Sequence, residues 1–212
     1  GTCYGETAYG TGAEVTIDKI PDGIDTDAAA GVVMAHATVT KRYANTYPFL
    51  TTPGYPQAIL YQLPRGTQDI VESYSGDFVN LRSGKTVKRS DVSIEDIAFA
   101  GNNAITAMTL SQENGDTVIR ATMNWRAPFS LTPNPYPTDP SQTQKYTFDS
   151  HQIVILFDYT TSIDKNAVAA IQEKISSSPL FSSASFERVF NQSRKIYQYK
   201  LTLNLRKAGS YY

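Results

Sequence analysis

The chain has 212 residues, of which 41% are hydrophobic and 18% charged, and its net charge is -1. This composition excludes an intrinsically disordered chain. No Lys/Arg run is longer than two residues, so we expect no direct binding of nucleic acid, and no apolar stretch approaches the roughly 18 residues of a membrane span. The single cysteine, Cys3, excludes an intramolecular disulfide and a cysteine-based metal cluster.

The first twelve residues, GTCYGETAYGTG, combine glycines and aromatic rings with few aliphatic side chains. The chain starts without a methionine and without a charged-then-apolar leader, so we expect a processed mature chain. The segment predicts an extended strand against another surface, its own or that of a neighbouring subunit, as in donor-strand pairing. The interface residues expected at the two ends of the chain are Cys3, Tyr4, Tyr9, Tyr211 and Tyr212. The sequence leaves open whether the Cys3 thiol is free, paired or modified.

An acidic, turn-rich segment, DKIPDGIDTD, follows. Its four carboxylates suit a hard cation such as calcium, although the spacing differs from that of an EF-hand loop. The alternative is that aspartate occurs here as a favoured turn residue. The candidate calcium ligands are Asp18, Asp22, Asp25 and Asp27.

Short β-prone runs fill the next part of the chain, and we expect residues 13–212 to form a single β-rich domain with a possible sub-boundary at 128–140. Two proline-rich stretches with aromatic residues, Tyr47–Pro56 and Pro128–Pro140, predict stiff surface loops. Ser83-Gly84 predicts a second hairpin turn. The expected strands are Ala13–Asp18, Gly31–Tyr43, Gln57–Leu63, Asp69–Ser75, Phe78–Leu81, Thr86–Lys88 and Val92–Ala100.

The segment from Ala104 to Trp125 predicts a β-hairpin, because two alternating runs flank Asn114-Gly115, a pair that favours a type I′ turn. A two-residue loop places an apolar set on one face of the hairpin, with Trp125 on that face and therefore in the core. The expected pairs are Glu113 with Asp116, Leu110 with Ile119, Met108 with Ala121 and Thr106 with Met123.

The C-terminal part predicts a βαββ segment. Its expected elements are a central strand His151–Tyr159, a helix Lys165–Ile175 with Asp164 as N-cap, a short strand Phe186–Phe190 and a half-buried strand Ile196–Arg206. This order is similar to that of ferredoxin-like modules in periplasmic parts of pilus-assembly machinery. The overall expectation is a mainly β chain with one helix (α+β), built on a large, mostly antiparallel sheet or sandwich.

Asp158, Thr160 and Ser162 in the run IVILFDYTTSID resemble the D-x-S-x-S metal-ion-dependent adhesion loop of von Willebrand A domains. The resemblance implies a divalent cation held by their oxygens. In that family a long α/β fold follows the motif, whereas only about fifty residues follow it here.

The usual catalytic groupings are missing from the sequence. There is no GxSxG, HExxH or phosphate-binding glycine motif, and the only histidines, His36 and His151, sit in or beside apolar strands, as structural histidines do. We therefore expect no enzyme and no cofactor apart from possible calcium.

Three function classes remain. The least favoured is an enzyme with carboxylate-only chemistry such as glycoside hydrolysis, which the scattered Asp and Glu residues leave open. The polar, Tyr- and Thr-rich composition and the glycine-rich leading residues favour a structural subunit that assembles with copies of itself into an extracellular, cell-surface or virion structure, fimbria-like or virion-like. The alternative is a periplasmic or cell-surface ligand-binding module, for carbohydrate or another ligand, that uses the two Pro/aromatic loops.

Overall fold

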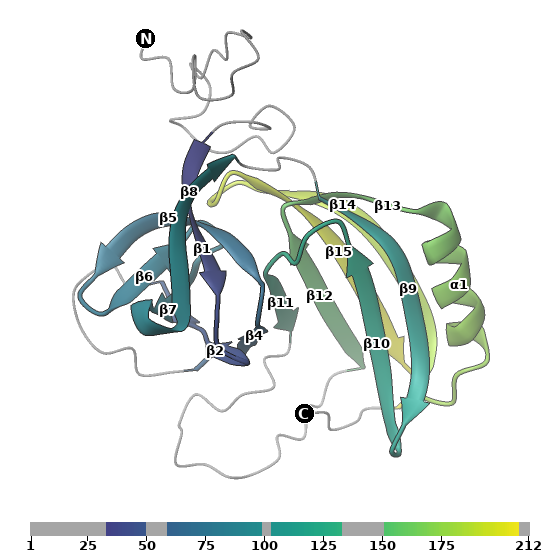
Figure 1. The fold of residues 1–212 in the computed structure, drawn as a ribbon. Coiled ribbons are helices and arrows are strands. Elements are labelled where there is room, and N and C mark those ends of the chain that lie inside the picture. Colours follow the sequence, from purple (N-terminus) through teal and green to yellow (C-terminus); the bar gives the residue numbers. More distant parts are fainter. Residues whose placement is uncertain (1–32, 50–58, 99–102, 133–150, 208–212) are drawn as a thin grey trace, which may run out of the picture.

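The structure is a computed structural model that describes residues 33–49, 59–98, 103–132 and 151–207. Strands dominate, and the described residues contain one α-helix, which confirms the expected β-rich α+β class. The strands separate into an N-terminal lobe, residues 33–98, and a C-terminal lobe, residues 103–132 and 151–207, which lie side by side (Figure 1).

The N-terminal lobe contains a six-stranded sheet in the order β3-β7-β6-β5-β1-β8 and the small pair β2-β4, all antiparallel. Its core is aliphatic and includes Val39, Leu63 and Leu81. The elements are β1 (Val33–Val39), β2 (Tyr43–Asn45), β3 (Tyr47–Pro48), β4 (Gln62–Pro64), β5 (Gln68–Ser75), β6 (Phe78–Leu81), β7 (Lys85–Lys88), the 3-10 turn η1 (Arg89–Asp91) and β8 (Val92–Ala98).

The C-terminal lobe is a sandwich of two sheets and a helix. One sheet has the order β10-β9-β13, the other β11-β12-β15-β14, and α1 packs against β9 and β14. In Figure 1 the helix lies on the side of this lobe that is remote from the N-terminal lobe. The elements are β9 (Asn103–Glu113), β10 (Asp116–Met123), β11 (Phe129–Thr132), β12 (Gln152–Asp158), β13 (Thr160–Ile163), α1 (Lys165–Ser176), β14 (Phe181–Asn191) and β15 (Ile196–Leu205).

The β9–β10 hairpin turns at the predicted residues. Asn114 and Gly115 have φ angles of 52° and 90°, the two positive values of a type I′ turn. The predicted pairing of Leu110 with Ile119 is confirmed, as are the pairs on either side of it. The pairing of Thr106 with Met123 is wrong, because a register shift after Thr122 places Met123 opposite Ile105.

Helix α1 begins as predicted. The Asp164 side chain accepts a hydrogen bond from the Asn166 backbone N–H at 2.7 Å, which satisfies a donor that has no partner within the helix. Ile171 and Ile175 are buried in the lobe core, where they close the sandwich at this end.

The two proline-rich stretches correct the sequence analysis where the structure describes them. Tyr47 and Pro48 form β3, and Tyr47 is buried with its ring edge-on to Phe78. Phe129 begins strand β11. Both strands lie at a sheet edge, where a proline costs no ladder hydrogen bond. Neither Tyr47 nor Phe129 is therefore an exposed loop aromatic, while residues 50–56 and 133–140 lie outside the described residues.

Strand β12 lies between β11 and β15, as expected of a central strand. At Tyr159, where φ is 57°, the chain bends out of this sheet and continues as β13, which pairs in parallel with β9. Sequence analysis missed β13. The predicted strand Phe186–Phe190 is longer than expected, because β14 extends from Phe181 to Asn191 along β15.

Candidate functional site

An apolar groove opens along the C-terminal lobe between β10 and the pair β11–β12. It has a larger part of about 930 Å³ and a smaller part of about 300 Å³, and both parts are lined by Ile119, Leu131 and Ile155. We call this feature the open groove. The larger part reaches the hairpin turn at Gly115, and the smaller part reaches Arg126 at the opposite end of β10.

The alternation of β10 builds one wall of the open groove. Ile119, Ala121 and Met123 face the lobe core, whereas the intervening Arg120 and Thr122 are exposed. The three core-facing residues are only partly buried, although Ile105 and Met108 of the same core are 1% and 2% exposed. The sandwich is thus closed on the side of α1 and incompletely covered on the side of β10.

Both strands beside the groove are sheet edges. Among the described strands, β10 pairs only with β9, and β11 pairs only with β12. Each therefore has a row of backbone N–H and C=O groups on which a further strand can be added. The eight residues of β10 span about 26 Å at roughly 3.3 Å per residue, which suits an extended peptide rather than a compact ligand.

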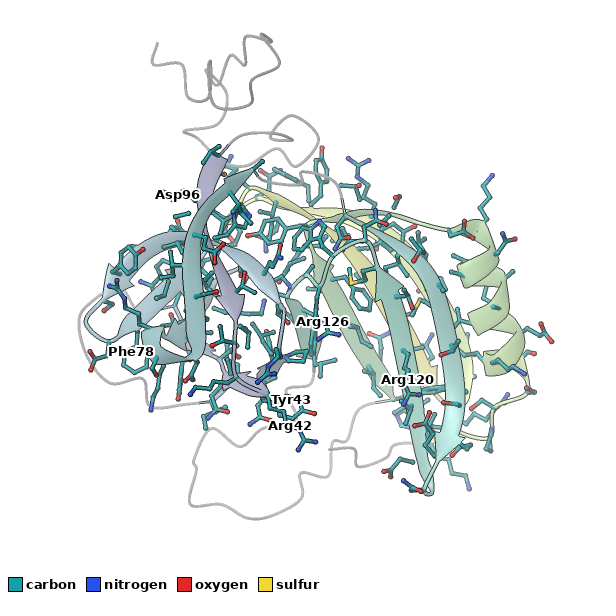
Figure 2. The ribbon with its side chains drawn as sticks, in the orientation of Figure 1. Arg42, Tyr43, Phe78, Asp96, Arg120 and Arg126 are labelled. Carbon is teal, nitrogen blue, oxygen red and sulfur yellow. The ribbon has the colours of Figure 1, made fainter. Side chains whose placement is uncertain are left out.

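A basic pocket of about 380 Å³ adjoins the Arg126 end of the groove. Its lining consists of Arg42, Tyr43, Pro64, Arg65 and Arg126, and it shares Pro64 and Arg126 with the smaller part of the groove. Figure 2 shows Arg42 and Tyr43 close together on the N-terminal lobe and Arg126 between the two lobes. The Arg65 side chain donates to the Thr40 carbonyl, and the Arg126 side chain donates to the Arg65 carbonyl. Both acceptors are neutral, so the pocket keeps a positive charge.

A second feature, the junction cluster, joins the lobes through buried polar side chains. The Lys85 Nζ atom of β7 lies 2.6 Å from Oδ2 of Asp158, which ends β12. The Gln198 amide donates to Oδ1 of Asp158 at 2.5 Å. The Tyr159 hydroxyl donates to Oδ1 of Asp69 in β5, also at 2.5 Å. None of these five side chains is more than 5% exposed.

Burial dominates the electrostatics of the junction cluster. It raises the pKa of Asp69 to about 6, against the opposing hydrogen bonds from Ser83 and Tyr159. Burial, together with the nearby Asp69, also raises the pKa of Tyr159. For Lys85 burial acts to lower the pKa, but attraction to Asp158 and further favourable contacts outweigh it and the pKa is raised. Lys85 and Asp158 thus form a buried ion pair.

The structure corrects the implied adhesion-type metal loop. Asp158 is 0% exposed and engaged by Lys85 and Gln198, Thr160 is buried and bonds the Asp158 carbonyl, and Ser162 is exposed on β13. The three side chains therefore do not converge on a site that a cation can reach. Among the described residues, no group of three His, Cys, Asp or Glu side chains is arranged to hold a metal ion.

The histidines occupy strand positions. His36 lies in β1, 4% exposed, and its Nδ1 lies 3.1 Å from the Met34 carbonyl. Desolvation lowers its pKa, against that hydrogen bond. His151 precedes β12, is exposed, and its carbonyl accepts from the Leu205 N–H. Trp125 is partly buried and packs against Tyr159 at the lobe junction, beyond the end of β10 and not in the core that the hairpin faces.

The other candidate residues lie outside the described part of the chain, so calcium binding and end-to-end contacts stay predictions. These residues are Cys3, Tyr4, Tyr9, Asp18, Asp22, Asp25, Asp27, Tyr211 and Tyr212. Sequence analysis identified the residues of the groove wall on β10 but neither the groove nor the junction cluster. The only local signal for the cluster was an aspartate at the end of an apolar strand.

Within the described ranges, no helix is long and apolar enough to cross a membrane. Comparison with known proteins gives no relative: no protein-family model, no curated protein and no solved structure matches this chain.

Proposed function

We propose that this protein is a non-catalytic structural subunit that assembles with copies of itself into an extracellular, cell-surface or virion structure. In this proposal the open groove of one copy receives residues 1–18 of a second copy, which we call the leading segment. The observation that carries the proposal is the incomplete sandwich, whose apolar interior opens between β10 and β11, each of which is a sheet edge among the described strands. Exposed apolar surface beside free strand edges favours pairing with another chain.

The sequence of the leading segment suits the groove. From Ala13 to Asp18 apolar and polar residues alternate, so that Ala13, Val15 and Ile17 share one face of a strand. That face matches the aliphatic lining of the groove, and the opposite, polar face would remain in contact with water. The Pro-rich run 133–140 is a poorer occupant, because proline cannot donate to a strand ladder.

Charge complementarity favours one direction of insertion. The leading segment is followed by the acidic residues Asp22, Asp25 and Asp27, and the basic pocket lies at only one end of the groove. With Asp18 at that end, the inserted strand runs parallel to β10 and antiparallel to β11. The acidic residues then meet Arg42, Arg65 and Arg126, which steers the encounter and fixes the register.

The absence of a catalytic role is part of the proposal. Asp69 and Tyr159, whose pKa values are raised by burial in the junction cluster, are shielded from solvent, so a substrate cannot reach them. The described lining of the groove is mainly aliphatic, and the polar side chains Gln112, Asp116 and Thr117 gather at the hairpin end.

The test is a charge placed in the groove. Leu131→Glu puts a carboxylate on the side chain that both parts of the groove share, whereas Thr132→Glu adds the same charge at the neighbouring exposed position of β11. We expect the wild type to form species heavier than its 23.3 kDa monomer in analytical ultracentrifugation. Leu131→Glu should weaken association by at least about tenfold, and Thr132→Glu should not.

Circular dichroism and thermal melts of both variants establish that the monomer remains folded. A wild type that stays monomeric at high concentration refutes self-assembly. Normal assembly of folded Leu131→Glu refutes the groove as the interface.

A further inference from the structure

The contact between Lys85 and Asp158 has the arrangement required for condensation of an amine with a carboxyl group. Nζ and Oδ2 are 2.6 Å apart, and the side chains are 2% and 0% exposed. Lys85 comes from β7 of the N-terminal lobe and Asp158 from β12 of the C-terminal lobe. The Tyr61 ring, whose centroid lies 5.7 Å from Nζ, adds an aromatic wall beside the amine.

We propose that Lys85 and Asp158 are a self-modification site, at which Nζ and Cγ join in an intramolecular isopeptide bond that covalently links the two lobes. This inference is independent of the proposed assembly, because it concerns contacts within one copy of the chain.

The bond forms by loss of water. The proton moves from Nζ to Oδ2 along their hydrogen bond, which leaves a neutral amine and a neutral acid. The Nζ lone pair attacks Cγ, and the electron pair of the carbonyl moves onto Oδ1. A second proton passes from Nζ to the Oδ2 hydroxyl, the Cγ–Oδ2 bond breaks and water leaves as the carbonyl re-forms. One ammonium and one carboxylate thus give one secondary amide and one water, with no oxidant, reductant or co-substrate.

The surroundings favour attack of the amine on the carboxyl group and formation of the neutral amide. The Gln198 N–H points at Oδ1, 2.5 Å away, where the negative charge of the tetrahedral intermediate develops. Well-oriented intramolecular reactions reach effective molarities of roughly 10⁵–10⁸ M, so holding the two groups in reacting position lowers the barrier to condensation. Condensation also replaces two desolvated charges by a neutral amide, and buried ions without water are costly.

A second carboxyl group lies close by. Asp69 interacts electrostatically with both Lys85 and Asp158, and its own oxygens are held by Ser83 and Tyr159. In its protonated form it no longer stabilises the ammonium of Lys85, so the reactive amine becomes more accessible. Asp69 therefore acts on the bond through the charge of Lys85.

Mass spectrometry of the denatured full chain tests the proposal directly. We expect the intact mass to be lower than the sequence mass by one water. Trypsin, which does not cleave after an acylated lysine, should then release a branched peptide that joins residues 83–88 to residues 146–165. This peptide separates the proposed bond from a succinimide at Asp22-Gly23, which also loses water but leaves these two peptides unlinked.

Lys85→Arg is the matched variant. Arginine keeps a positive charge that can pair with Asp158, but its guanidinium stays protonated and does not condense. We expect the full sequence mass and separate peptides from this variant. A wild-type chain with the full sequence mass, cleaved after Lys85, overturns the proposal whether or not the variant folds.

Discussion

Tyr159 shows how a single residue sets the path of the chain. Its φ of 57° is rare for a bulky side chain and costs of order 1–3 kcal/mol. The residue is fully buried, its hydroxyl bonds Asp69 and its ring lies 5.7 Å from that of Trp125. These contacts hold the strained backbone, and the strain lets one continuous segment serve both sheets of the C-terminal lobe.

Asp69 is expected to make stability depend on pH. Its pKa is raised by burial from 3.8 to about 6, so the folded state holds this proton more tightly than the unfolded state. Its contribution is fully present below the unfolded pKa and is lost as pH rises through the folded value. The loss between pH 4 and 7 is about 3 kcal/mol in the free energy of unfolding.

Asp69→Asn tests this dependence, because an amide mimics the protonated acid and can still accept from the Tyr159 hydroxyl. We expect the variant to be more stable than the wild type at pH 7 and to lose the fall in stability between pH 4 and 7. Urea unfolding at several pH values measures both quantities. Asp96→Asn, which removes an exposed carboxylate on β8, controls for net charge. An unchanged pH dependence in Asp69→Asn would contradict the assignment.

At the scale of elements, the β9–β10 hairpin gives a clean test of turn chemistry. A Cβ atom at Gly115 would meet no heavy atom within 4 Å, so a substitution there acts through its φ of 90° alone. Gly115→Val should therefore lower the free energy of unfolding by more than about 1 kcal/mol. Asn114→Gly, which keeps a residue tolerant of positive φ, should be close to neutral. Equal melting temperatures for the two variants would argue against a strained turn.

Sequence analysis identified the elements whose side chains alternate or repeat with helical spacing. β10, β15 and α1 have such patterns, and their cores and pairings follow from them. β13 and the first half of β14 contain short polar runs, TTSI and SSAS, and become strands only because β9 and β15 supply their backbone partners. That information lies far away in the chain, and no local pattern contains it.

The candidate site was beyond local prediction for the same reason. The alternation of Ile119, Ala121 and Met123 predicts an apolar face but not how completely the facing sheet covers it. How completely that face is covered depends on the fact that β10 and β11 are the last strands of their sheets. This strand order is set by pairing over the whole lobe. Lys85 and Asp158 are 73 residues apart and meet only through the docking of the two lobes.

At the scale of the whole molecule, the lobes are joined by contacts besides the junction cluster. The Tyr61 ring stacks on Phe129, with centroids 5.8 Å apart, and its hydroxyl donates to Ser130. Arg194, in the β14–β15 turn, lies over the Phe49 ring and leaves no room for a Cβ atom at Gly84. Strand pairing changes from one lobe to the other between Ala98 and Asn103, and the sub-boundary at 128–140 stays a prediction.

The last prediction tests whether association needs the alternating sequence of the leading segment or only its presence. In a strand formed by residues 13–18, Val15 and Thr16 point to opposite sides, so the same substitution tests the two faces. Val15→Asp would place a charge against the aliphatic lining and should abolish association, because a carboxylate without a partner is costly in an apolar site. Thr16→Asp faces water and should assemble like the wild type.

Ultracentrifugation of both variants, and of a chain lacking residues 1–18, measures the result. Equal assembly of all three would show that the subunits associate through another surface. Loss of association in both point variants but not in the truncated chain would show that the added charge prevents association and that the segment is not needed for it.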